Sequence, residues 1–229
     1  MRPLAIASAM RWFLTGVVVV CVTGMVMPFL TGGSSSSPFM KMASAGFVLV
    51  AVACGAVKNS YGRLVLAGLL CCAAGDVLGP KNFVAGLGAF LLAHLVFIAA
   101  FAVHGISLRR LTATLPAVLL ATAALLAWLY PHVPASDRFP VLAYMAVITA
   151  MLITAGGGSA GATGKLILAA AVLFYVSDIF VARWKYVSPG SYSINGLFCY
   201  PLYYSACLSF AWTVLLDLRE REAEIPSRC

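Results

Sequence analysis

Charged residues are scarce in this sequence. Of its 229 residues only 10% are charged and 62% are hydrophobic, and the mean hydropathy is +1.00. A soluble domain has about 25% charged and about 45–50% apolar residues. A water-soluble globular protein is therefore excluded, because this chain cannot hide its apolar surface from water. The composition instead predicts an all-α polytopic membrane protein, a bundle in which helices satisfy their own backbone hydrogen bonds.

Several functional signatures are also missing. The seven cysteines form neither a C-x-x-C pair nor a Cys/His pattern with metal-ligand spacing, so we interpret them as small buried hydrophobes and expect no metal and no redox cofactor. The net charge of +8 comes without an aromatic-interleaved basic patch, and the cations sit at the ends of apolar runs. This pattern favours lipid headgroups over nucleic acid as partners. The segment GGGSAGATG lacks the Walker pattern, and we interpret it as a flexible loop.

Eight apolar runs are present, each near the roughly 20 residues that a membrane span needs. Short connections rich in Gly, Pro, Ser or charge separate them, so no soluble domain is inserted. We expect a single domain over residues 1–229, with a short N-terminal segment (1–11) and a solvated polar tail (217–229). The runs are Trp12–Leu30, Phe39–Val57, Leu64–Leu78, Phe83–Val103, Ala113–Tyr130, Phe139–Ala155, Lys165–Val181 and Gly196–Leu216.

Orientation follows from the first run and from the positive charges. The apolar stretch after Arg2 and Arg11 is about 18 residues long, which exceeds the h-region of a typical signal peptide, so we expect a retained first span. Ten of the 15 Lys and Arg residues would lie on the side of the termini. The positive-inside rule then predicts that both termini are cytoplasmic. The membrane would be the bacterial inner membrane, or the endoplasmic reticulum in a eukaryote.

Two acidic residues lie within apolar runs. An ionised Asp at the centre of a span costs about 2.5–3.5 kcal/mol, so Asp76 and Asp178 each need a partner, a proton or a function. His94 lies within the following run, and the rise of about 1.5 Å per residue brings it to a depth near that of the acids. By the same estimate Lys41, Tyr203 and Tyr204 would share one polar cavity with them in the outer half of the membrane.

Structural roles remain open for each of these residues. Asp76 is close enough to a helix end to be a solvated acid or an anchor for the Gly-Pro-Lys-Asn turn, and Asp178 has the alternative of an ion pair with Lys41 or Arg183. His94 would also fit as a core histidine that hydrogen bonds a neighbouring helix. Lys41 has the alternative of an interfacial lysine with its charge in water. The adjacent tyrosines 203 and 204 would also fit an aromatic belt.

Five segments together resemble a known family. The sequence resembles the YhhN-like membrane proteins, the lysoplasmalogenases, over roughly Phe39 to Thr213. Two positions depart from that pattern: Cys207 replaces a common Gln, and Lys-Met replaces Lys-Pro at the first segment. The matching segments are Lys41 near the start of an early span, AGDVLGPKNFVAGLGAFLLAH around Asp76 and His94, PVLAY with Tyr144, LFYVSDIF with Ser177 and Asp178, and PLYYSAC with Tyr203 and Tyr204.

The resemblance implies an enzyme. It would hydrolyse the vinyl ether of lysoplasmalogens to a fatty aldehyde and glycerophosphocholine or glycerophosphoethanolamine, without a cofactor. Such a reaction needs a general acid and a base. Two carboxyls can divide these tasks as in glycosidases. The sequence leaves open which is which; we favour Asp178 as acid and Asp76 as base or cation stabiliser, and His94 would orient one carboxyl or relay a proton. The expected substrate-binding residues are Lys41, Tyr144, Ser177, Tyr203 and Tyr204.

Other classes of membrane protein bury the same residue types. A proton-coupled transporter also places Asp and His within the membrane, and a non-catalytic lipid-binding protein would need the same apolar cavity. An intramembrane aspartyl protease uses two Asp residues, but here Ala-Ala-Gly-Asp stands in place of G-x-G-D. Asp217, at the end of the last run, is expected to tolerate neutralisation. The sequence leaves the headgroup preference and the oligomeric state open.

Overall fold

All eight apolar runs become helices. The computed structural model describes residues 2–31 and 37–224, and the regular structure in these residues is entirely helical, which confirms the all-α prediction. The helices begin and end within a few residues of the expected runs, except at the chain ends. They are α1 (Arg2–Thr31), α2 (Ser37–Ala53), α3 (Ser60–Leu78), α4 (Phe83–His104), α5 (Leu108–Leu129), α6 (Arg138–Gly156), α7 (Ala162–Ala182) and α8 (Tyr192–Glu224), with short turns η1 (Ala56–Lys58), η2 (Tyr130–His132) and the π-helical η3 (Arg183–Val187).

Two asparagines define where α3 and α4 begin. The side chain of Asn59 accepts a hydrogen bond from the backbone N–H of Gly62, and Asn82 accepts one from Ala85. Asparagine is among the best N-cap residues because its side-chain oxygen satisfies an N–H that the first turn leaves free. The polar connections between apolar runs therefore carry the helix start signals for the pair that supplies Asp76 and His94.

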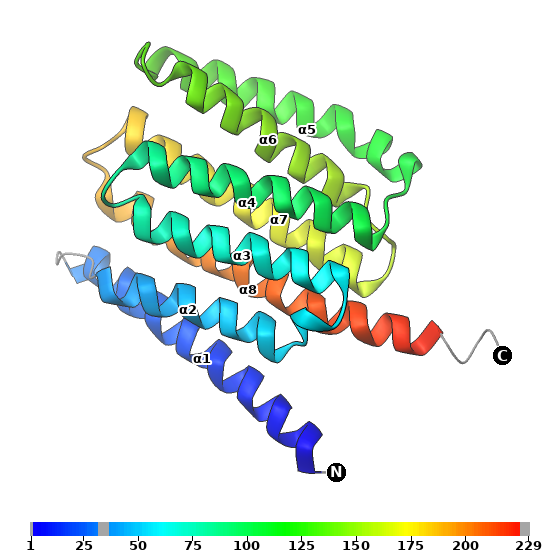
Figure 1. Ribbon diagram of the computed structural model, residues 1–229. Coiled ribbons are helices and arrows are strands. Elements are labelled where there is room, and N and C mark those ends of the chain that lie inside the picture. The colour runs from blue at the N-terminus through cyan, green and yellow to red at the C-terminus, as the bar shows by residue number, and fades with distance from the viewer. Residues whose placement is uncertain (1, 32–36, 225–229) are drawn as a thin grey trace.

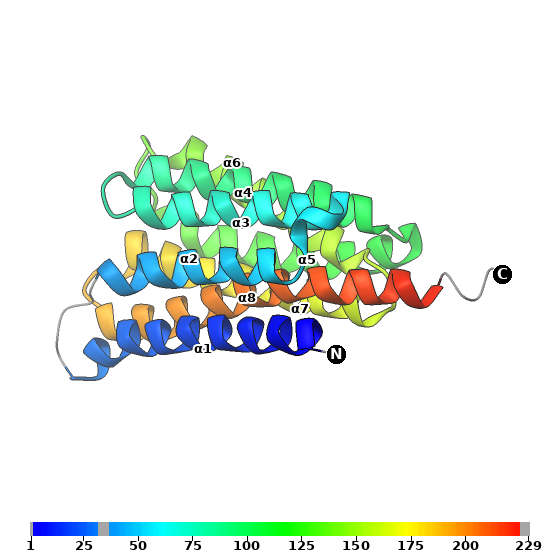
Figure 2. The same ribbon diagram turned by 60° about the horizontal axis from the view of Figure 1, so that its bottom comes forward.

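The helices run side by side in one bundle (Figures 1 and 2). Helix α8 lies inside and contacts α1, α2, α3 and α7, whereas α5 packs on the outside against α6. The fully buried rings of Phe47, Phe97, Phe174 and Phe210 lie between the inner helices. The beginning of α1 and the end of α8 lie at the same end of the bundle (Figure 1), as an even number of helices requires.

The outer surface of the bundle is apolar. Within the described residues, seven helices are long and apolar enough to cross a membrane, and the eighth, α2, has a shorter apolar stretch, Pro38–Ala53. Large side chains such as Phe139 (82% exposed), Leu108 (76%) and Leu120 (74%) point outward. An apolar exterior is stable when its solvent is lipid rather than water. The protein is thus an integral membrane protein.

Three expectations about polar segments are corrected. Helix α1 already begins at Arg2 and its candidate membrane span at Ala7, so residues 2–11 are helical and the span begins earlier than Trp12. Helix α8 continues to Glu224 and Asp217 is only 1% exposed, so the polar tail begins later than residue 217. The glycine-rich α6–α7 connection is buried at residues 156–158, and the N–H of Ser107 donates to the carbonyl of Gly157 at 2.8 Å. Partners on other helices, invisible in the sequence, hold these segments. Residues 225–229 lie outside the described residues.

Candidate active site

A cavity of about 730 Å³ opens at the end of the bundle that holds the α3–α4 turn. Its walls come mainly from α3, α4, α6, α7, η3 and the start of α8, with one residue each from α2 and α5, and most of the lining side chains are apolar or aromatic. Asp76 and Asp178 both line it. The volume lies within the range of roughly 300–1,000 Å³ that small-molecule sites occupy, so a single ligand can reach both carboxyls from one space.

Two glycines allow the α3–α4 hairpin to close tightly. A Cβ on Gly75 would lie 2.7 Å from the Phe90 ring, and one on Gly86 would lie 2.5 Å from the Cα of Gly79. Any larger side chain would push the two helices apart, because those contacts are well inside van der Waals distance. The Gly-Asp pair and the Phe-x-x-Gly spacing are thereby explained: they bring Asp76 against the cavity wall of α4.

Asp76 is held by hydroxyl groups from two helices. Its Oδ2 lies 2.5 Å from the Ser44 Oγ, 3.0 Å from the Tyr203 hydroxyl and 3.3 Å from the Tyr204 hydroxyl. Ser44 and Tyr204 also lie within hydrogen-bond distance of the Met40 carbonyl. No described residue donates to Oδ1 of Asp76, so the side of the carboxyl that lines the cavity is open to a ligand.

Asp178 belongs to a second hydrogen-bond chain. The Tyr144 hydroxyl donates to its Oδ2 at 2.6 Å, and the His94 Nε2 lies 2.9 Å from the same hydroxyl and 3.7 Å from Asp178 Oδ2. Since the tyrosine proton goes to the carboxylate, Nε2 carries the hydrogen and donates to the tyrosine oxygen. The His94 side chain is fully buried, and its Nδ1 has no hydrogen-bond partner among the described residues.

Aromatic rings connect the two chains of hydrogen bonds. The Phe174 ring packs edge-on against both His94 and Tyr203, with centroid distances of 4.7 and 5.3 Å. Phe90 packs edge-on against Tyr203 at 5.7 Å. The two carboxyls are therefore fixed around a rigid apolar wall, an arrangement that suits acid–base chemistry on a ligand without much charge.

Asp76 and Asp178 do not have the structural roles that the sequence left open for them. Asp76 is buried among hydroxyls and does not anchor the neighbouring turn. Asp178 makes no ion pair with Lys41 or Arg183 in the described part of the chain; Arg183 instead donates to the Asn195 side chain. Both acids thus face the cavity with neutral hydroxyl donors as their hydrogen-bond partners.

The remaining expected site residues divide into two groups. Tyr144, Tyr203 and Ser177 line the cavity, although the Ser177 hydroxyl donates to the Phe174 carbonyl of its own helix. Tyr204 lies behind Tyr203 and reaches Asp76. Lys41 is exposed and does not line the cavity, because its neighbour Met40 takes the inward-facing position on α2.

Two further residues, Ser44 and Lys185, belong to the site although the sequence did not single them out. Ser44 follows Met40 by one helical turn and therefore lies on the same face of α2. A hydroxyl on that face was the only feature of the sequence that could have identified Ser44 as a site residue. Lys185 is the only cation among the side chains that line the cavity, and its Nζ lies 4.7 Å above the Phe83 ring. Cys207 is fully buried and does not line the cavity.

The described residues, 2–31 and 37–224, include several His, Cys, Asp and Glu side chains that would be able to bind a metal ion if they were grouped. Within them no group of three or more His, Cys, Asp or Glu side chains is arranged to hold a metal ion. The cavity instead offers two carboxyls, one imidazole and several hydroxyls.

Comparisons with known proteins find relatives that are named lysoplasmalogenases. The lysoplasmalogenases of Mycobacterium tuberculosis and Mycobacterium bovis are each 37% identical over 138 residues, which cover 55% of this chain and 51% of theirs. Human lysoplasmalogenase TMEM86B is 32% identical over 136 residues, 58% of this chain and 55% of the relative. The chain spans about half the length of the curated relatives it matches. No solved structure matches it.

The aligned family pattern includes the whole cavity. The model of the YhhN family matches residues 36–214, which contain both carboxyls, His94 and the tyrosines of α6 and α8. This match extends over far more than half of the 229 residues, and the chain belongs to the YhhN family.

Proposed function

We propose that this protein hydrolyses the vinyl ether bond of lysoplasmalogens, the reaction for which its relatives are named. The observation that carries the proposal is the pair of carboxyls, Asp76 and Asp178, on the wall of one largely apolar cavity. A single apolar chain suits this space, and a vinyl ether is a neutral group that needs only proton transfers and water to be cleaved.

The two carboxyls can supply and accept every proton that vinyl ether hydrolysis requires. The acid adds its proton to the alkene carbon remote from the ether oxygen, which leaves an oxocarbenium ion. Water bonds to that cation while the second carboxylate takes its proton, giving a hemiacetal. When the hemiacetal C–O bond breaks, the first carboxylate recovers a proton from the hemiacetal hydroxyl and the second returns one to the glycerol oxygen. A fatty aldehyde and a glycerophospho-alcohol leave, and both residues are restored.

The hydrogen bonds suggest which carboxyl is which. Three hydroxyls converge on Oδ2 of Asp76, and an ionised carboxylate, which only accepts, is the partner that several donors fit best. Asp76 therefore takes the role of base and cation stabiliser. Asp178 takes the role of acid, with Tyr144 and His94 as the relay that orients it and exchanges its proton.

The headgroup would lie at the mouth of the cavity. Lys185 provides a positive charge there, next to the aromatic rings of Phe83, Trp184 and Tyr186. A lysine binds phosphate as a point charge, and aromatic rings attract a quaternary ammonium or ammonium group. We propose that Lys185 contacts the phosphate, whereas the sequence had placed Lys41 among the substrate-binding residues. Both termini would be cytoplasmic, which places this mouth on the opposite side of the membrane.

The test uses the purified full chain with three matched lysolipids: an alkenyl lysophosphoethanolamine, an alkenyl lysophosphocholine and an ester lysophosphocholine. Aldehyde release from the alkenyl lipids is expected, with no aldehyde from the ester. A folded sample that releases no aldehyde from either alkenyl lipid contradicts the proposal. Proton flux across a reconstituted vesicle without any product would instead support a proton-coupled transporter, and tight lipid binding without turnover would support a lipid-binding protein.

A further inference from the structure

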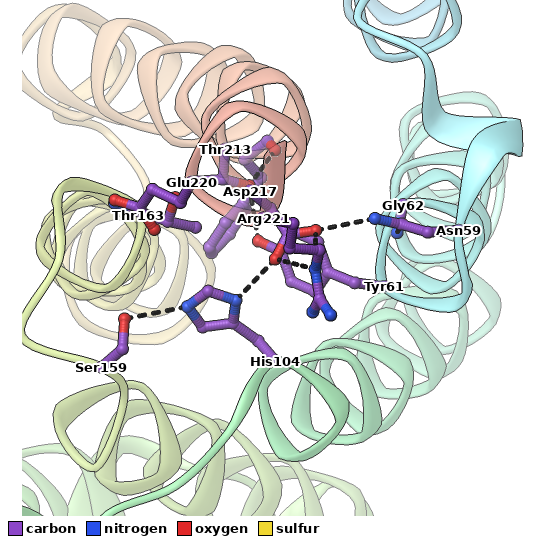
Figure 3. A network of polar contacts seen from close by, with 11 residues as sticks. Asn59, Tyr61, Gly62, His104, Ser159, Thr163, Thr213, Asp217, Glu220 and Arg221 are labelled. Carbon is purple, nitrogen blue, oxygen red and sulfur yellow. Dashed lines mark hydrogen bonds and ion pairs between the residues drawn. The ribbon is translucent and has the colours of Figure 1, made fainter. Parts of the chain in front are cut away.

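A serine, a histidine and an aspartate form a hydrogen-bonded row at the opposite end of the bundle (Figure 3). The Nε2 of His104 lies 3.0 Å from the Ser159 Oγ, and its Nδ1 lies 3.0 Å from Asp217 Oδ1. His104 ends α4, Ser159 lies in the α6–α7 loop, and Asp217 is on α8. Three segments distant in sequence are thus brought into the order found in Ser-His-Asp hydrolases, which are recognised by geometry rather than by fold.

The carboxylate decides the direction of each hydrogen bond. Asp217 is 1% exposed, and both of its oxygens accept from Arg221 at 3.0 and 2.9 Å while Asn59 donates to Oδ2 at 2.7 Å. With these donors it is an ionised acceptor, so the His104 Nδ1 must carry the hydrogen. The Nε2 lone pair is then free to accept the Ser159 hydroxyl proton, the tautomer that a general base requires.

The serine is held firmly and remains accessible. Ser159 is partly exposed, whereas the glycines before it are buried and the Ser107 N–H ties down the Gly157 carbonyl. A Cβ on Gly164 would lie 2.0 Å from the Ser159 carbonyl oxygen, so the loop packs directly on the first turn of α7. Residues 157–161 have the spacing G-x-S-x-G. This loop joins two helices and has no non-glycine residue at positive φ, so it shares the spacing but not the strained elbow of α/β-hydrolases.

Backbone donors lie next to the serine. The N–H groups of Ala160 and Gly161, just before α7 begins at Ala162, have no acceptor among the described residues, and the Thr163 N–H is taken by Glu220 at 3.1 Å. Free N–H groups beside a nucleophile stabilise the oxyanion of a tetrahedral intermediate. Nothing in the vinyl ether reaction uses these groups, because that substrate has no carbonyl carbon and the carboxyls that serve it line the cavity at the other end.

We propose that Ser159, His104 and Asp217 form a second catalytic site, a serine hydrolase centre for carboxylic esters. The Ser159 Oγ bonds to the ester carbonyl carbon while its proton passes to His104 Nε2. The tetrahedral intermediate expels the alcohol, which takes that proton, and leaves an acyl-serine. Water then bonds to the acyl carbon, gives its proton to His104, and the released Oγ recovers it as the carboxylic acid leaves. Asp217 keeps its charge throughout and stabilises the imidazolium.

The experiment treats the purified full chain with a fluorophosphonate, in which a serine oxygen displaces fluoride from phosphorus, and locates the adduct by mass spectrometry. One phosphonyl group on Ser159 is expected. Ser136 is the matched internal control, because it is an exposed loop serine that hydrogen bonds a carboxylate, Asp137 at 2.9 Å, without a histidine. An unlabelled Ser159, or labelling of Ser159 no faster than Ser136, overturns the proposal without the need for any variant.

Turnover of a p-nitrophenyl ester gives the second readout. Ser159→Ala and His104→Gln are each expected to lower it by at least about 100-fold, the lower end of a general-base contribution, and Ser136→Ala should leave it unchanged. His104→Gln should also abolish phosphonylation of Ser159, since Gln keeps a hydrogen bond but cannot take the proton. If His104→Gln labels at the wild-type rate, the row is a structural clamp between α4, the α6–α7 loop and α8, and the catalytic assignment is wrong.

Discussion

The two ends of the bundle each place an aspartate next to a histidine of α4, but the aspartates have different hydrogen-bond partners. At the cavity, Asp76 and Asp178 accept from the hydroxyls of Ser44, Tyr203 and Tyr144 and face open space. At the opposite end, Asp217 accepts from a guanidinium, an amide and an imidazole. The histidines are ten residues apart on α4, which is about 15 Å of helix.

This difference shows that burial alone does not identify a reactive acid. Asp217 is more deeply buried than Asp178, whose side chain is 19% exposed, yet its charge is matched by Arg221. A carboxylate paired with an arginine stays ionised and serves as an anchor. Carboxyls with neutral partners and access to a cavity can gain and lose a proton on a ligand. In the proposed roles the cavity acids react themselves, whereas Asp217 acts only through His104.

The largest expected effect is at the cavity acids. Asp76→Asn and Asp178→Asn should each lower aldehyde release from an alkenyl lysolipid by about 10²–10⁴-fold, because an amide can neither donate the carboxyl proton nor act as a base. The double variant should fall short of the product of the two single losses, since the residues act as a unit. Glu222→Gln, which removes an exposed carboxylate from α8, is the control. Near-normal turnover in either buried variant would make that residue structural.

The next effect concerns the tyrosines that hold these acids. Tyr144→Phe and Tyr203→Phe each remove a hydrogen bond to a buried carboxyl, an interaction of about 1.5–3 kcal/mol when one partner is charged. Aldehyde release should fall by about 10- to 100-fold. Tyr130→Phe is the matched control, because that ring is 40% exposed and lies outside the cavity. Equal activity of all three variants would remove the tyrosines from the mechanism.

The next smaller effect is a loss of stability in Asp217→Asn, at the end of the bundle opposite the cavity. Neutralising this residue removes the ionised acceptor of His104, whose side chain is 6% exposed, and should cost about 1–3 kcal/mol, the penalty for leaving a buried partner unsatisfied. A lower midpoint of thermal unfolding in detergent is expected, whereas Glu222→Gln should match the wild type. The sequence had suggested that Asp217 tolerates neutralisation, so an unchanged midpoint would restore that interpretation and weaken the anchor role.

The smallest effect is expected at the cavity mouth. Lys185→Ala should raise KM for an alkenyl lysolipid by about 2- to 5-fold with little change in kcat, because an exposed charge contributes up to about 1 kcal/mol. Lys81→Ala, an exposed lysine in the α3–α4 turn, serves as the control. If Lys41→Ala raises KM and Lys185→Ala does not, the phosphate lies beside α2, as the sequence had suggested.

The sequence predicts most of the fold because its signals are local. Runs of apolar residues long enough to span a bilayer define the helices, and turn residues such as Asn59 and Asn82 define where two of them begin. An aspartate inside an apolar run is conspicuous for the same reason. Residues 76, 94 and 178 stand out from the sequence for this reason, whereas Tyr144 is implied only by the family resemblance.

The sequence by itself thus determined the membrane-helical class, the helices and the positions of two acids within apolar runs, because hydropathy and the cost of a charge in lipid depend on local sequence alone. Tertiary structure decided everything that depends on helix rotation. It turned Ser44 and Met40 inward and Lys41 outward, and it placed Lys185 at the mouth. It also brought Ser159 and Asp217, which are 55 and 113 residues from His104 in the sequence, into contact with that histidine. A run that is apolar on every side gives no signal of which face turns inward, and only packing against neighbouring helices settles it.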